Sequence, residues 1–194
     1  VSKSAGSSSN PENGDFYGVN AAILATNGAT VDIKNSDISS SAQNGNGVFS
    51  YGGGTTVNSS DATISTTADN SGGIQPAGGG TTNAADLTVT TACNSSAAIR
   101  SDRGGGTVNV TGTGNTLTST TGTALNVANT TIGASGLTFL SISANGAANG
   151  IVLNTTGSSG GLTVTGTSTT NGTGGTMQNT TGRGASVVTA SNIT

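Results

Sequence analysis

The stretch Gly47-Val-Phe-Ser-Tyr-Gly-Gly-Gly-Thr-Thr-Val57 recurs twice, in altered form, further along the chain. Its counterparts are Gly73-Ile-Gln-Pro-Ala-Gly-Gly-Gly-Thr-Thr-Asn83 and Ala98-Ile-Arg-Ser-Asp-Arg-Gly-Gly-Gly-Thr-Val108. Each begins with a small and an aliphatic residue, and each carries a glycine triplet: Gly52–Gly54, Gly78–Gly80 and Gly104–Gly106. Because glycine adopts positive φ angles at little cost, the evenly spaced triplets predict one tight corner repeated through successive turns of a solenoid.

Aliphatic residues extend this repeat in three parallel tracks. Members of the first track recur about every 25 residues, a period typical of solenoids. They are Ile23, Val48, Ile74, Ile99, Leu125 and Ile151, and Val187 is a seventh candidate after a longer gap. The second track comprises Val31, Val57, Val108 and Ile132, with Asn83 in the slot between Val57 and Val108, and the third Ile38, Ile64, Val89, Leu117 and Phe139. Three short β-favouring segments in each repeat predict a right-handed parallel β-helix of about seven rungs, each about 25 residues long.

The repeat also suggests how the 194 residues are organised. Residues 1–19 are expected to form a polar N-terminal segment or cap, and residues 20–194 a single β-helix domain. The longer gap before Val187 predicts a loop or enlarged turn around Thr155–Gly175. A narrow solenoid explains why only 31% of residues are hydrophobic, since each rung needs few inward side chains and pairing between rungs satisfies the backbone.

Composition argues against several classes of partner. The chain has a net charge of −3 and five basic residues, too few for the Lys/Arg patch that nucleic acid requires. No apolar run approaches the ~20 residues of a membrane span. Histidine is absent, and no phosphate-binding glycine loop precedes a helix, so no cofactor is expected apart from a Ca²⁺ ion considered below.

Several segments resemble secreted adhesin-like β-helix proteins of bacteria and archaea, which belong to the broad pectate-lyase-like superfold. These segments are residues 20–31, 47–52, 70–74 and 96–106. Residues 122–132 and onward to 174–179 are similar to the β-strand repeats of large bacterial surface proteins. The resemblance implies a β-helix in an extracellular or cell-surface setting, but it does not imply one activity, because the superfold hosts lyases, hydrolases, adhesins and phage fibres.

Asp37, Asp61 and Asp86 are separated by nearly the length of one repeat, and this spacing predicts that they stack in successive rungs, with Asn115 next. One interpretation is a Ca²⁺ site made of stacked carboxylates. The favoured interpretation is a series of turns in which the short side chain bonds the backbone at each corner.

Arg100, Asp102 and Arg103 form a second candidate site just before a glycine corner. Arginine suits recognition of carboxylates or sugar acids, so the three residues could contact a ligand. A local Arg–Asp salt bridge on a solvated turn is the simpler interpretation.

The sequence favours a non-catalytic structural or adhesive module of the cell surface, because titratable groups are scarce. One alternative is a self-assembling filament subunit whose copies stack head to tail, with the N-terminal segment of one molecule completing the open end of the next. Another is a polysaccharide lyase or hydrolase, which would need clustered carboxylates. The expected partners are surface glycans or further copies of the chain. A truncated or modular piece of a longer surface protein is favoured over the filament.

Overall fold

The computed structural model describes residues 1–167 and 169–194; residue 168, inside the loop expected around Thr155–Gly175, lies outside the described part. One helix and seventeen strands are found there. They are β1 (Ser2–Lys3), α1 (Pro11–Tyr17), β2 (Ile23–Ala25), β3 (Thr30–Ser40), β4 (Val48–Tyr51), β5 (Thr56–Thr66), β6 (Ile74–Ala77), β7 (Thr81–Thr91), β8 (Ile99–Ser101), β9 (Thr107–Thr111), β10 (Thr116–Thr120), β11 (Leu125–Ala128), β12 (Thr131–Phe139), β13 (Ser141–Asn145), β14 (Ile151–Asn154), β15 (Leu162–Val164), β16 (Met177–Gln178) and β17 (Ala185–Val188).

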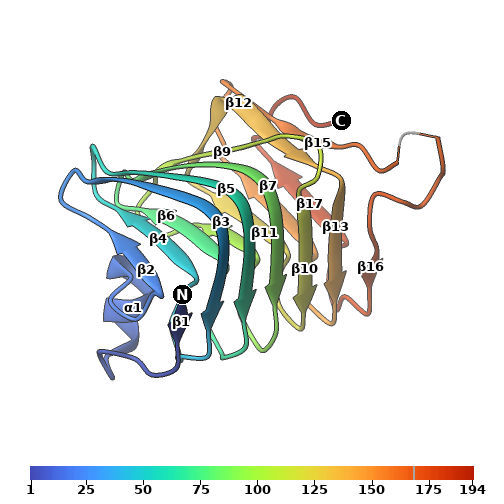
Figure 1. The fold of residues 1–194 in the computed structure, drawn as a ribbon. Coiled ribbons are helices and arrows are strands. Elements are labelled where there is room, and N and C mark those ends of the chain that lie inside the picture. The colour runs from blue at the N-terminus through green and yellow to red at the C-terminus, as the bar shows by residue number, and fades with distance from the viewer. Residues whose placement is uncertain (168) are drawn as a thin grey trace.

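The strands form a parallel β-solenoid, which confirms the predicted fold class. They stack side by side along one axis, as Figure 1 shows, in two sheets. Sheet A has ten strands, and sheet B has seven in the order β17-β14-β11-β8-β6-β4-β2. The strand pairs of both sheets are parallel, as expected when each turn of the chain lies on the one before.

The expectation of about seven rungs is too high, because the regular part of the solenoid has about five turns. The first five turns carry regular strands in both sheets. In the next turn the sheet A strands shrink to three residues in β15 and two in β16, and β17 is the last strand of sheet B. The insertion between β15 and β16 lengthens this turn, so the apolar spacing alone overestimated the number of regular rungs.

Sheet B confirms the first aliphatic track as one inward ladder. Ile23 pairs with Val48, Val48 with Ile74, Ile74 with Ile99, Ile99 with Leu125 and Leu125 with Ile151. The seventh member is Ala185, which pairs with Ile151, whereas Val187 pairs with Leu153 two positions further along. The assignment of Val187 to this track was therefore wrong by two residues. Because side chains alternate along a strand, a shift of two residues still leaves Val187 on the inward face.

Sheet A corrects two positions of the other tracks. Thr82, and not Asn83, lies between Val57 and Val108, because the repeat shortens by one residue after the second glycine triplet. Ile142, and not Phe139, continues the third track from Leu117. The second and third segments of a rung also merge into single strands of 11 residues in β3, β5 and β7, so these turns contain two strands where three were expected.

The glycine triplets form the predicted corner between sheet B and sheet A. Gly52, Gly78 and Gly104 open this corner in three successive turns, with φ angles of 90°, 58° and 80°. These angles lie in the left-handed region, which side chains with a Cβ rarely adopt. The corner therefore turns sharply without a side chain on its outer surface.

The N-terminal segment packs on the chain's own solenoid. β1 pairs with the end of β3, so it covers part of one edge of sheet A. Asn20, which is 1% exposed, accepts hydrogen bonds from the amides of Ser7 and Ser8 at 2.7 and 2.9 Å. Helix α1 ends at Gly18 and lies against buried Phe49 on the outer face of sheet B. The helix thus covers a side of the solenoid, whereas a cap, as expected for residues 1–19, would cover its end.

No helix in the described ranges is both long enough and apolar enough to cross a bilayer.

Candidate ligand-binding site

The candidate site lies on the outer face of sheet B, where one residue of each strand points away from the core. Strand register puts these residues in a single row: Leu24, Phe49, Gln75, Arg100, Asn126, Val152 and Ser186. Helix α1 covers the second and third members of this row, Phe49 and Gln75, which are fully buried. Beyond the helix, the row continues through Arg100 and Asn126.

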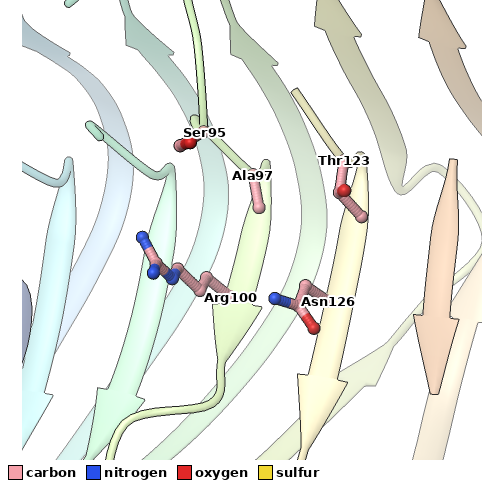
Figure 2. A pocket seen from close by; sticks show the side chains of 5 residues that line it. All are labelled: Ser95, Ala97, Arg100, Thr123 and Asn126. Carbon is pink, nitrogen blue, oxygen red and sulfur yellow. The ribbon is translucent and has the colours of Figure 1, made fainter. Parts of the chain in front are cut away.

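A shallow groove of about 170 Å³ opens beside Arg100. Figure 2 shows Arg100 on one strand and Asn126 on the next, with Thr123 just before that strand. Ser95 and Ala97, which precede β8, complete the lining. The groove therefore offers a guanidinium, an amide and two hydroxyl groups beside a small apolar surface.

Asp102 organises the charges around this groove. Arg100 Nε donates to Asp102 Oδ1 at 2.9 Å, and Asn126 Nδ2 donates to Asp102 Oδ2 at 3.0 Å. Arg103 Nε lies 3.6 Å from the same Oδ1 atom. Both oxygens of this carboxylate are thus engaged, which holds Arg100 and Asn126 in fixed positions.

Arg103 points to helix α1 and does not line the groove. Its Nη2 atom lies 3.5 Å from Asp15 Oδ2, and its guanidinium lies 4.8 Å from the centre of the Phe16 ring. Gln75 Nε2 also donates to the carbonyl of Asp15, at 2.8 Å. These contacts indicate that Arg103 fastens the helix to the solenoid through an ion pair and a cation–π contact.

The structure therefore divides the three predicted residues among different roles. The predicted Arg–Asp salt bridge is present, Arg100 lines the groove, Asp102 positions it, and Arg103 holds α1. Sequence reasoning missed Asn126 and Thr123, although they stand one repeat after Arg100 and Ala97, the groove residues of the preceding turn. The repeat spacing was the signal that could have found them.

The second candidate set does not stack as predicted. Asp37 pairs with Thr63, so it is not in register with Asp61. Asp61 and Asp86 do lie in adjacent strands, and Asn35 takes the position before them. Asn35, Asp61 and Asp86 have φ angles of 47°, 52° and 52°, in the left-handed region where short polar residues are favoured. The prediction included Asp37 because it relied on residue spacing alone. It did not locate the backbone bend, which falls at Asn35 in that strand.

Asn115 is not the next member of that stack either. Gly112, with φ of 89°, occupies the bend in the following turn, since Ala85 pairs with Thr111. Asn115 is fully buried, and its side chain bonds backbone groups of Leu87, Thr111 and Thr138. Within residues 1–167 and 169–194, no three His, Cys, Asp or Glu side chains gather in a group that could hold a metal ion.

We expect neither CaCl₂ nor EDTA to shift the melting temperature, because Asp61 and Asp86 are exposed at a backbone bend that asparagine also adopts. Asp86→Asn should leave the melting temperature unchanged or slightly higher, since it removes a like charge from the adjacent strand. Asp86→Val should lower the free energy of unfolding by about 1–2 kcal/mol, because a β-branched residue resists this conformation. A calcium-dependent rise in melting temperature that Asp86→Asn abolishes would instead establish a metal site.

Comparison of the chain with protein-family models, with curated proteins and with solved structures finds no match. The parallel β-solenoid fold therefore stands on the chain's own strand pairing.

Proposed function

We propose that this protein is a non-catalytic structural or adhesive module of an extracellular or cell surface, and that the groove beside Arg100 contacts surface glycans. The observation that carries the proposal is the pairing of Asp102. Both of its oxygens are bound by groove residues, so the groove presents hydrogen-bonding groups without a free carboxylate.

Glycan contact fits the chemistry of the lining. The terminal nitrogens of Arg100 make no hydrogen bond with another residue in the described part of the chain, so they remain available as donors. Ser95 and Thr123 supply hydroxyls, and Asn126 supplies an amide oxygen. Such groups can form hydrogen bonds with the hydroxyls of a saccharide. The Arg100 side chain is only 8% exposed, so it is held nearly rigid before the ligand binds.

The alternative of a polysaccharide lyase or hydrolase has less support. Glycoside cleavage generally uses two carboxyl groups that flank the scissile bond. Near this groove, the carboxylates of Asp102 and Asp15 are engaged by arginines. Asp61 and Asp86 lie on the other sheet, at an exposed bend.

Affinity electrophoresis through gels that contain neutral or acidic polysaccharides tests the proposal. At least one glycan should retard the wild-type chain. Arg100→Gln and Asn126→Ala should each weaken retention about tenfold, the effect of one lost charge-assisted or neutral hydrogen bond. Arg183→Gln is the matched control, because Arg183 is exposed just before β17 and does not line the groove.

Two outcomes would contradict this function. Failure of every glycan to retard the wild-type chain would remove the adhesive role. Release of unsaturated or reducing sugars during incubation would show that the protein is an enzyme.

A further inference from the structure

Sheet A carries a regular array of hydroxyl groups on its outer face. Beyond the bend, the second halves of β5 and β7 lie side by side with β10 and β13 (Figure 1). Each of these four segments has two outward residues separated by one inward residue, and all eight outward residues are threonine or serine. They form two columns, which we call the hydroxyl grid: Thr63, Thr88, Thr116 and Ser141 in one, and Ser65, Thr90, Thr118 and Ser143 in the other.

Strand pairing sets the spacing of the hydroxyl grid. The register passes through all four strands without a shift at these positions, so neighbours in one column are about 4.8 Å apart. The two columns are separated by two residues along each strand, which is about 6.7 Å. The number of residues from one strand to the next varies along the chain, so only the pairing shows that the hydroxyls are aligned.

The grid rests on a rigid support. Ile64, Val89, Leu117 and Ile142 point inward between the two columns, and each is 0–1% exposed. Because these side chains are packed in the core, the strands that carry the grid are held in place. The hydroxyl-bearing residues of one strand therefore keep a fixed position relative to those of the next before any ligand binds.

Most of these hydroxyls are available to a ligand. In the described part of the chain, Ser143 Oγ accepts a hydrogen bond from the amide of Thr176 at 3.2 Å, and the other seven hydroxyls have no partner. The first half of sheet A differs, since the side-chain amides of Asn58, Asn83 and Asn109 bond one another. The sheet thus satisfies its outward amides on one side of the bend and leaves its outward hydroxyls open on the other.

The composition of the grid restricts what it can bind. None of its residues is charged, and the carboxylates of Asp61 and Asp86 lie at the bend beside it. A high β propensity explains threonine on an exposed strand, but it does not explain serine at three of the eight positions. The grid also has no large apolar side chain, so another protein would gain little by covering it. Evenly spaced, uncharged hydroxyls instead suit a ligand with a regular hydrogen-bonding lattice of its own.

Ice is such a ligand. The prism faces of hexagonal ice repeat their water oxygens along two perpendicular directions, at spacings close to those of the grid. Each hydroxyl both donates and accepts hydrogen bonds, as a water molecule in that lattice does. We propose that the hydroxyl grid binds an ice surface and slows the growth of the crystal there. This activity belongs to sheet A and is separate from the glycan groove on sheet B.

Thr118→Lys tests the proposal against a matched control, Thr131→Lys. Thr118 is exposed within the grid, between Thr90 and Ser143, whereas Thr131 is exposed at the start of β12, outside it. Neither change should disturb the fold, and equal melting temperatures would confirm this. Wild type and Thr131→Lys should become enriched in a slowly growing ice crystal and should lower its freezing point below its melting point. Thr118→Lys should lose nearly all of both effects, because a long charged side chain would hold the flat face away from the ice.

Thr118→Ser keeps a hydroxyl at the same position and should retain most of the activity. Exclusion of the wild-type chain from ice would overturn the proposal, and so would equal ice binding by Thr118→Lys. Wild-type dimers that Thr118→Lys dissociates in sedimentation experiments would show that the grid contacts a second copy and would overturn it too. Arg100→Gln separates this inference from the proposed function, because it should lose glycan retention and keep ice binding.

Discussion

Replacing Ile74 with aspartate is expected to lower the free energy of unfolding by about 4–5 kcal/mol, a large share of the total for a domain of this size. Ile74 is fully buried in the third turn, between Val48 and Ile99 of the inward ladder. A carboxylate there would lose its hydration without gaining a partner, because the surrounding column is aliphatic. Urea denaturation followed by far-UV circular dichroism measures the loss.

Two further variants separate the effect of burial from that of substitution itself. Thr90→Asp introduces the same side chain at an exposed position of β7 and should change stability by less than about 0.5 kcal/mol. Ile74→Val removes one methylene from the ladder and should cost about 1 kcal/mol. An Ile74→Asp chain with the wild-type melting temperature would show that this residue does not face the core.

Asn115→Leu is expected to destabilise the protein by about 3–5 kcal/mol, although it exchanges a polar residue for an apolar one of similar size in a fully buried position. Asn115 Oδ1 accepts from the amide of Leu87 at 2.8 Å. Its Nδ2 atom donates to the carbonyl oxygens of Thr111 and Thr138 at 2.7 and 3.0 Å. Leucine would leave these three backbone groups, which belong to three successive turns, without their partner. Each orphaned buried group costs about 1–3 kcal/mol.

Asn115→Asp sharpens this test, because it keeps the shape and the acceptor but turns a second oxygen toward two carbonyls. It should cost about as much as the leucine variant, since a buried charge would face like partial charges. Asn171→Leu changes an exposed asparagine and should leave the melting temperature within about 1–2 °C of wild type. If Asn115→Leu melts like Asn171→Leu, the side chain does not tie the turns together.

The inward ladder was predictable because a parallel solenoid stacks equivalent residues at a constant spacing, and aliphatic residues report that spacing directly. Ile23 through Ile151 were therefore found in register. Errors arose where one turn gains or loses a residue. Asn83, for example, lies opposite Asn58 and Asn109, and these amides hydrogen-bond along an outward ladder. An asparagine in a valine track was the sign that the register had slipped.

The candidate site was less predictable, because its main contacts join segments that no spacing relates. Arg103 meets Asp15 and Phe16 only because helix α1 folds back onto sheet B. A repeat pattern places residues within the solenoid but says nothing about where a non-repeating helix docks. The pairing of Arg100 with Asp102 lies within one turn, and it was accordingly anticipated from sequence.

The register of β5 has a consequence for how such a chain can change over generations. Ten residues of β5 pair with β3, and the same ten pair with β7, without a shift on either side. A turn of this kind presents the same backbone pattern above and below, so its two neighbours would also pair with each other if it were removed. Duplication or loss of the codons for one whole turn would therefore lengthen or shorten the rod by one step and leave the strand pairing of sheet A continuous on either side.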